Sequence, residues 1–292
     1  MMNMSMEGRV CLITGATSGM GKATAAGLAR LGATVVLVAR DQEKGIAVRD
    51  ALRVQSGNTR VDVLYADLSS QQAIRALATS FTQRYPQLHV LVNNAGGIFF
   101  RRETTVDGLE LTFALDHLAY FLLTNLLLDM LKTSAPARII NVSSNAEGVG
   151  RINFDDLQSV RRYSAFPVYA QAKLANLLFT YELARRLVGS GVTVNAITPG
   201  PVATNFGGSG QSLLNRLFPL IFQVIGKRPE QAAETAIQLA TDRELGQVTG
   251  KAFYGQRELQ TSSRSHDVAV QQRLWQISAD LTRVAVPAGQ PA

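Results

Sequence analysis

Short runs of Val, Ile and Leu alternate along the chain with longer stretches in which apolar residues recur every three or four positions. The short runs predict buried strands, and the periodic stretches predict helices. Strands are expected at Val10–Thr14, Thr34–Ala39, Val61–Ala66, His89–Asn93, Arg138–Ser143, Val192–Thr198 and Lys251–Tyr254. Helices are expected at Lys22–Leu31, Asp41–Ser56, from Ser69 or Ser70 to about Tyr85, and at Leu109–Leu131, Val168–Val188 and Pro229–Thr241.

The order of these elements predicts the fold class. Strands without polar alternation are buried on both faces, and a strand–helix–strand order implies parallel pairing. We expect an α/β fold with a doubly wound parallel sheet of the Rossmann type, about seven strands flanked by helices. Because no linker or repeat divides the chain, residues 1–292 are expected to form a single domain. A substrate loop or lid is expected at about 201–227, and a C-terminal extension at about 256–292.

Composition and charge narrow the partners of this domain. Hydrophobic residues make up 46% of the 292 residues and charged residues 17%, as is typical of globular chains. The net charge of +7 comes from 29 basic and 22 acidic residues that are scattered along the sequence. Without a stripe of Lys and Arg, the charge favours phosphorylated small molecules as partners and no nucleic acid.

Cysteine usage and hydropathy bear on the compartment. The single cysteine, Cys11, has no internal partner for a disulfide, which indicates a reducing environment. No segment reaches the roughly 18 apolar residues of a transmembrane helix. The start, Met1–Met6, lacks the basic-then-apolar pattern of a signal peptide. A cytoplasmic location without a transmembrane segment is therefore expected.

The turn after the first strand carries three glycines, Gly15, Gly19 and Gly21. Glycine at such a turn permits positive φ, close approach of the backbone to a pyrophosphate, and tight helix–strand packing. The N–H groups at the start of the following helix then point at the phosphates. A glycine-rich turn alone is weak evidence, but between a strand and a helix it predicts nucleotide binding.

The end of the second strand bears on the choice of dinucleotide. About 20 residues after the glycines, such folds place the residue that meets the adenosine ribose. Here that position holds Arg40, and the first acidic residue is Asp41. A guanidinium pairs with the 2′-phosphate of NADP, whereas NAD is usually met by a carboxylate. We expect NADP(H), with NAD(H) as the less favoured cofactor; the alternative is a solvent-exposed loop arginine.

A Tyr–Lys pair lies in the helical stretch Val168–Val188. The spacing of Tyr169 and Lys173 places the phenol and the ammonium one turn apart on the same helix face. A free phenol has a pKa of about 10, and a neighbouring cation favours its ionised form. We therefore expect Lys173 to lower the pKa of Tyr169 and to make the phenol useful as a general acid or base. The bare pair is also compatible with an ordinary helix surface.

Six motifs appear in an order that resembles the short-chain dehydrogenase/reductase family. They are Thr14-Gly15-x-x-x-Gly19-x-Gly21, Asp67-Leu68, Asn93-Asn94-Ala95-Gly96, Ser143-Ser144, Tyr169-x-x-x-Lys173 and Pro199-Gly200-x-Val202-x-Thr204. Within the family, residues 102–110 and 116–125 look most like the retinol dehydrogenase-like branch. That branch acts on lipophilic alcohols and carbonyls, usually with NADP(H).

The resemblance implies roles at the matching positions. Tyr169 is expected to exchange the proton with the substrate oxygen, Lys173 to bind the nicotinamide ribose, and Ser144 to hydrogen-bond the reacting oxygen. Tyr169 and Lys173 thereby count among the cofactor contacts as well. The other cofactor-binding positions implied are Gly15, Thr17, Ser18, Gly19, Met20, Gly21, Arg40, Asp67, Leu68, Asn93, Ala95, Gly96, Pro199, Gly200, Val202 and Thr204. The implied reaction is hydride transfer between nicotinamide and a lipophilic alcohol or carbonyl.

Two positions depart from the family pattern. The long helix usually carries an asparagine that helps relay protons through water, and the matching residue here is Asp116. An aspartate still accepts hydrogen bonds, but it adds a charge and loses a donor. We count Asp116 among the candidate catalytic residues. The separation of Ser144 and Tyr169 is longer than usual, and the inserted residues 145–164 are expected to border the substrate pocket.

Several alternatives remain open on the sequence alone. The departure at Asp116 is compatible with a nucleotide-sensing module of the same fold that turns nothing over. An epimerase or dehydratase shares Tyr-x-x-x-Lys but spaces its glycines differently, and a Ser-His-Asp hydrolase lacks the nucleophile elbow. No metal site is expected, because His89, His117 and His266 show no ligand spacing.

Two surfaces are also open to interpretation. Residues 213–225 are amphipathic and follow three glycines, which favours a mobile lid over an apolar substrate or, alternatively, a surface helix or an oligomer contact. The helices at Leu109–Leu131 and Val168–Val188 have wide apolar faces. From the family we expect them to pair across a homodimer or a homotetramer.

Overall fold

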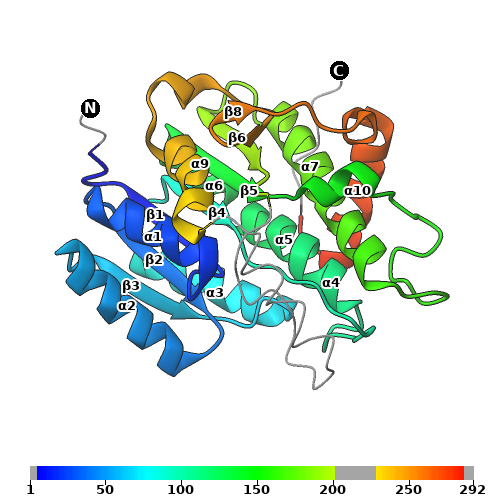
Figure 1. Ribbon diagram of the computed structural model, residues 1–292, viewed down its shortest axis with the longest axis horizontal. Helices are drawn as coiled ribbons and strands as arrows, with labels where there is room; N and C mark the ends of the chain where they lie inside the picture. The colour runs from blue at the N-terminus through cyan, green and yellow to red at the C-terminus, as the bar shows by residue number, and fades with distance from the viewer. Residues whose placement is uncertain (1–4, 201–227, 286–292) are drawn as a thin grey trace.

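The computed structural model describes residues 5–200 and 228–285 and contains one eight-stranded sheet among them (Figure 1). The strand order is β3-β2-β1-β4-β5-β6-β7-β8. All neighbouring pairs are parallel except β7 and β8, which are antiparallel. The strands are β1 (Val10–Thr14), β2 (Thr34–Ala39), β3 (Val61–Tyr65), β4 (Val90–Asn93), β5 (Ala137–Val142), β6 (Val192–Ile197), β7 (Lys251–Tyr254) and β8 (Arg257–Glu258).

Helices cover both faces of the sheet, which confirms the doubly wound α/β fold. One face packs on α1 (Gly19–Arg30), α2 (Gln42–Ser56) and α9 (Pro229–Thr241). The other face packs on α3 (Gln71–Arg84), α5 (Ala119–Leu126), α6 (Leu128–Thr133), α7 (Ala165–Arg186) and α10 (Val268–Thr282). None of the helices described is long and apolar enough to cross a bilayer.

The alternation along β1 explains why the strand is apolar throughout. Leu12 belongs to the core under α3, α5 and α10, whereas Cys11 and Ile13 belong to the core under α1, α2 and α9. Successive side chains of a strand point to opposite faces, so a strand covered on both faces needs apolar residues at every position. The sequence shows this pattern directly, and the seven expected strands lie within one or two residues of their predicted bounds.

The helix ends follow local capping chemistry. Asp41 caps α2 by accepting a hydrogen bond from the Lys44 N–H at 2.8 Å. Of the two serines expected before α3, Ser70 is the cap and accepts from the Ala73 N–H at 3.3 Å. Such caps satisfy N–H groups that have no partner inside the helix.

The prediction of a single helix over Leu109–Leu131 is wrong. The segment contains a three-residue α4 (Leu111–Phe113), a π-helical turn η1 (Ala114–Leu118), and then α5 and α6, separated at Leu127. A π turn inserts an extra residue into the helix, and such turns occur frequently at functional sites. Here the inserted turn carries Asp116, whose side chain is fully buried.

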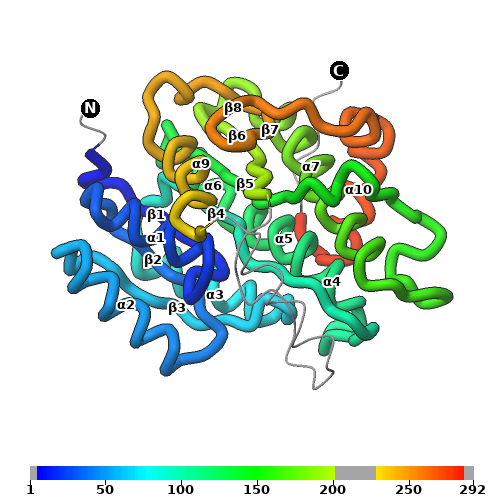
Figure 2. The backbone as a smooth tube through the Cα atoms, in the orientation of Figure 1, coloured from blue at the N-terminus to red at the C-terminus, as the bar shows by residue number. Residues whose placement is uncertain are grey.

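The C-terminal extension contains a helix that the sequence reading left unassigned. Helix α10 packs along α7 and α5 and lies beside α7 in Figure 2. Its Trp275 meets the Phe121 ring edge-on at 4.9 Å and stacks on Phe179 at 5.8 Å, and the Arg186 guanidinium lies 4.2 Å from the indole centre. Within this single chain, α10 therefore covers apolar surface of α5 and α7. The homodimer or homotetramer stays a prediction, and pairing through the surface under α10 requires that helix to move.

Trp275→Ala is expected to lower the free energy of unfolding by about 3–5 kcal/mol, because it leaves a cavity between α10, α5 and α7. Urea unfolding followed by far-UV circular dichroism measures the change. Val268→Ala is the matched control, since Val268 begins the same helix and is 46% exposed. If the two substitutions lowered the free energy of unfolding equally, packing of the Trp275 indole would not be what holds α10 on α5 and α7.

Candidate active site

The expected site residues gather at the carboxyl ends of the parallel strands. Ser144 follows β5, Pro199 and Gly200 follow β6, and the glycine turn follows β1. The strand order reverses between β1 and β4, and ligands bind in open parallel sheets at such a switch point. The structure thus brings together segments that are far apart in the sequence.

The glycine turn leaves room for backbone only. Gly15 has φ +63°, and a Cβ on Gly21 would lie 2.4 Å from the Gly15 carbonyl oxygen. The turn is held by Asn94, which donates from its side chain to the Thr14 carbonyl at 2.8 Å and to the Gly15 carbonyl at 3.2 Å. The Thr14 hydroxyl in turn accepts the N–H groups of Asn94 and Ala95 at 2.8 and 3.0 Å. We expected no role for Thr14 and Asn94, although both lie within the quoted motifs.

The start of α1 is suited to a phosphate. Ser18 is the N-cap residue, but its side chain makes no capping hydrogen bond, and the first turn of α1 contains no acidic residue. The positive end of the helix dipole and its N–H groups are therefore not neutralised by the side chains of the helix start. Thr17 and Ser18 are partly or fully exposed there, whereas Met20 is buried in the core. This helix start and the close-packed glycine turn fit the pyrophosphate of a dinucleotide.

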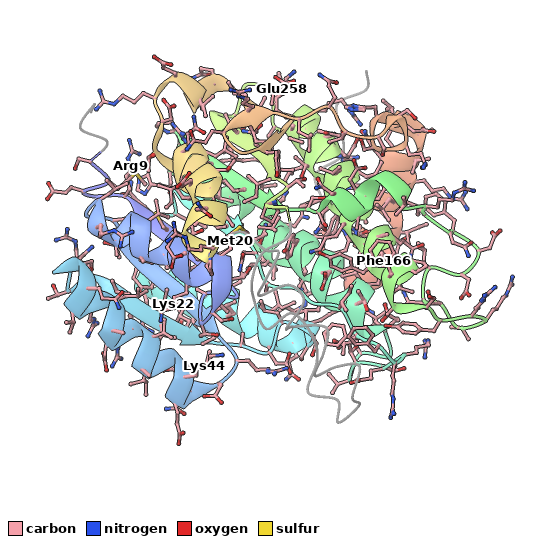
Figure 3. All side chains as sticks on the ribbon, viewed as in Figure 1. Arg9, Met20, Lys22, Lys44, Phe166 and Glu258 are labelled. Atoms are coloured by element: carbon pink, nitrogen blue, oxygen red, sulfur yellow. The ribbon has the colours of Figure 1, made fainter. Side chains whose placement is uncertain are left out.

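The residues at the adenosine end follow β2 and β3. Arg40 comes directly after β2 and is exposed, while the Asp41 carboxylate is engaged as the cap of α2. Figure 3 labels Lys44 on the first turn of α2 and Lys22 on the first turn of α1. This edge therefore presents cations where a 2′-phosphate is expected.

After β3, Asp67 is exposed and accepts from the backbone and the hydroxyl of Ser69 at 2.9 and 2.7 Å. Leu68 points into the core, where it is 8% exposed. Of these two residues, Asp67 is therefore the one with an exposed side chain, and its contact with an adenine stays a prediction.

The segment after β4 differs in detail from the expectation. The side chain of Asn93 is fully buried and donates to Thr124 and to Asn141, each at 2.9 Å, so its side chain joins β4 to α5 and β5, and its role in cofactor binding stays a prediction. Gly96 lies against Asp116, because a Cβ there would be 3.0 Å from the carboxylate. The next N–H, that of Gly97, donates to Asp116 Oδ1 at 2.9 Å.

After β6, Gly200 has φ +75° and little room for a side chain, because a Cβ would lie 3.0 Å from the Tyr254 ring. Glycine at this position therefore permits a turn that other residues would strain. Val202, Thr204 and the expected lid at 201–227 lie outside the described residues.

Helix α7 presents the Tyr–Lys pair to this edge. Tyr169 is 8% exposed and is a hydrogen-bond partner of Ser144, whose hydroxyl also accepts the Ala146 N–H at 3.2 Å. The neighbouring Ser143 donates to the Lys173 carbonyl at 2.8 Å and so fastens the middle of α7 to the end of β5. Ser144 is therefore both a turn serine, as the cap of the short helix η2 (Asn145–Val149), and a neighbour of the phenol.

Lys173 is buried beside a carboxylate. Its Nζ lies 3.0 Å from Asp116 Oδ2, and the two side chains are 2% and 0% exposed. The same nitrogen is 5.3 Å from the centre of the Tyr169 ring and 5.8 Å from that of Tyr120. Burial is the largest single influence and disfavours the charged lysine, but Asp116 together with Tyr120 and Tyr169 outweighs it and raises the pKa of Lys173. Burial also raises the pKa of Asp116, and the ammonium opposes that rise.

The expected acidification of Tyr169 is not found in the protein alone. Burial raises the pKa of the Tyr169 phenol above its ordinary value, and Lys173 lowers it only in part. The Asp116 carboxylate acts in the opposite direction from Lys173 because it repels a phenolate. The sequence placed the cation correctly, but the counter-charge comes from another helix.

A close-packed glycine turn on a parallel sheet, beside a buried Tyr–Lys pair, fits an oxidoreductase that uses a nicotinamide cofactor. The sequence profile of the family described as short chain dehydrogenase matches residues 9–212. The chain belongs to the short-chain dehydrogenase family and is similar to its retinol dehydrogenases.

Individual relatives extend over nearly the whole chain. Human retinol dehydrogenase 13 is 42% identical over 97% of this chain and 87% of its own length. A crystal structure of an uncharacterised protein from Mycobacterium paratuberculosis is 33% identical, covers 97% of both chains and has a TM-score of 0.77. The RhlG/NADP active-site complex of Pseudomonas aeruginosa is 30% identical, covers 86% of this chain and 96% of its own, and has a TM-score of 0.66.

Proposed function

We propose that this oxidoreductase transfers hydride between NADP(H) and a lipophilic alcohol or carbonyl, with Tyr169 as the proton donor or acceptor. The observation that carries the proposal is the convergence of Tyr169, Lys173 and Ser144 at the carboxyl edge of the sheet, next to the glycine turn. The name of human retinol dehydrogenase 13 supports an alcohol substrate, and the RhlG complex supports NADP as cofactor.

The chain's own residues supply orientation and the proton. The bound nicotinamide supplies the hydride in reduction or accepts it in oxidation. In reduction, the Ser144 hydroxyl donates a hydrogen bond to the carbonyl oxygen, and the Tyr169 phenol delivers its proton to that same atom. Lys173 keeps a positive charge beside the resulting phenolate. In oxidation the proton moves from the alcohol to Tyr169.

The surroundings of Tyr169 favour an apolar substrate. Its ring packs with Ile98, Ala146 and Ala170, and Phe100 borders the same cluster. Phe166, on the first turn of α7, is 53% exposed and is labelled in Figure 3. Apolar walls around a few polar groups are typical of sites for lipophilic small molecules.

A panel of aldehydes, ketones and alcohols, monitored by NADPH absorbance, tests the proposal. We expect NADPH consumption with apolar carbonyls and NADP⁺ reduction with the matching alcohols. Tight NADPH binding without turnover in either direction across the panel would favour the alternative, a nucleotide-sensing module, for which the aspartate at position 116 is the motivating observation.

Arg40→Asp is expected to lower kcat/KM for NADPH by about 10- to 100-fold, because a hydrogen bond to a charged group contributes about 1.5–3 kcal/mol. The value for NADH should change little or rise, since a carboxylate suits the free 2′-hydroxyl. Kinetics with both cofactors measure the switch. Arg30→Asp is the control, because Arg30 is exposed at the opposite end of α1. An unchanged preference in Arg40→Asp would remove the basis for NADP selectivity.

Two further expectations stay predictions. The cytoplasmic location rests on the single cysteine, Cys11, which is buried. A homodimer or homotetramer rests on the family alone. Fractionation of the source cells and light scattering of the purified chain test them.

A further inference from the structure

Building on the proposed function, we propose that Asp116 is a positioning residue that holds Lys173 and balances its charge, so that the site keeps Tyr169 as a neutral, proton-donating phenol through neutral pH. The proposal rests on a buried charge arrangement that this chain forms at a position where an asparagine was expected. Its consequence is a pH dependence of catalysis that an asparagine would not produce.

The carboxylate is fixed from two sides. Oδ1 accepts the Gly97 N–H at 2.9 Å, and Oδ2 lies 3.0 Å from Lys173 Nζ. Gly96 presses against the same carboxylate, and the Asn176 side chain donates to the Asp116 backbone carbonyl at 2.8 Å. The π turn η1 is therefore anchored to α7 through both its backbone and its side chain.

The titratable groups around Tyr169 come from three elements. Lys173 lies on the same helix, Asp116 lies on η1, and Tyr120, which is neutral, lies on α5. His117 also faces Lys173, but burial lowers the pKa of its imidazole to about 4, so it is neutral at physiological pH. The Glu110 carboxyl caps α4; burial and, to a smaller extent, the Asp116 carboxylate raise its pKa, and Glu110 is not among the groups that shift the pKa of Tyr169.

Charge balance then decides which protons the site holds. With Asp116 ionised, Lys173 protonated and Tyr169 neutral, the buried group has no net charge. With asparagine at position 116, the same two protons would leave one uncompensated positive charge in a buried site. Tyr169 and Lys173 would then lose a proton at lower pH, which leaves either a phenolate at Tyr169 or a neutral Lys173. An ammonium has three donors, so Lys173 keeps two for a ribose and for Tyr169 while it contacts Asp116.

The first test is the pH profile of kcat/KM in both directions, with saturating NADPH or NADP⁺. In Asp116→Asn, the midpoints of the falling limb for carbonyl reduction and of the rising limb for alcohol oxidation should move to lower pH by about one unit or more. Glu110→Gln is the matched control, because it also removes a fully buried carboxyl, and its midpoints should stay with the parent protein. The proposal would be overturned if the midpoints of Asp116→Asn coincided with those of the parent protein or moved to higher pH. It would also be overturned if Glu110→Gln shifted them as far as Asp116→Asn does.

The second test needs neither turnover nor the Asp116 variant. The near-UV absorbance titration of the parent chain minus that of Tyr169→Phe isolates the ionisation of Tyr169. We expect it no earlier than that of free tyrosine, at a pH of about 10. Ionisation near neutral pH would overturn the role of Asp116. A chain that moves no hydride but shows the late ionisation would refute the proposed function and leave the charge balance intact.

Discussion

Tyr169→Phe is expected to lower kcat for carbonyl reduction by about 10²- to 10⁴-fold, the usual contribution of a positioned general acid. The substitution removes only the phenol oxygen, and the ring keeps its packing against Ile98 and Ala146. Because Lys173 stays in place, the dissociation constant for NADPH should change less than threefold, roughly within the range of neutral contacts. Steady-state kinetics and a fluorescence titration with NADPH measure the two quantities.

The control for this substitution lies on the same helix. Tyr181 is also buried on α7, but its hydroxyl bonds to Thr261 at 2.8 Å, outside the site. Tyr181→Phe should therefore leave kcat near that of the parent protein. A kcat for Tyr169→Phe within tenfold of the parent would mean that the proton reaches the substrate by another route.

Lys173→Met is expected to abolish measurable turnover and to lower the free energy of unfolding by about 3–5 kcal/mol, because it leaves the Asp116 carboxylate buried without its positive counter-charge. The double variant Lys173→Met with Asp116→Asn should regain much of that stability, since no buried charge remains. It should not regain activity, because the cation beside Tyr169 is still missing. Urea unfolding and NADPH-linked assays, run on all three variants, separate the two roles.

The stability of Lys173→Met should also depend on pH. Burial raises the pKa of the Asp116 carboxyl in the folded state above its value in the unfolded chain, and this variant lacks the Lys173 ammonium that opposes the rise. A raised folded-state pKa stabilises the fold at acid pH, and the benefit disappears as pH rises through that pKa. The single variant should therefore lose less stability in acid than at neutral pH, whereas the double variant should not show this difference. Equal losses at both values of pH would argue against a buried Asp116 charge.

Some parts of the fold can be predicted from the sequence because they depend on residues that are close together along the chain. The seven apolar runs, the Asp41 and Ser70 caps and the one-turn spacing of Tyr169 and Lys173 are set by the local period of the chain. Helix α10 also carried a readable signal, because Val270, Leu274, Trp275 and Ser278 recur at helical spacing after the cap Asp267. The expectation for that stretch was only a C-terminal extension.

Other features had no local signal. The helical pattern of Leu109–Leu131 runs through the π turn without a glycine or a proline that would mark it. The inward direction of the Asn93 side chain depends on Thr124 and Asn141, which come from α5 and β5. These contacts join residues that only the folded chain brings together.

The sequence by itself determined the doubly wound sheet, the glycine turn and the identity of the Tyr–Lys pair, because each follows from hydrophobic period, backbone freedom or spacing within one element. Only the tertiary structure decided which charge lies against that pair. The Asp116 carboxylate reaches Lys173 from the π turn η1, and the burial of all three groups strengthens an interaction that would be weak in water. The spacing in the sequence shows that Tyr169 and Lys173 can lie side by side, whereas burial and the charge of Asp116 influence how tightly each of them holds its proton.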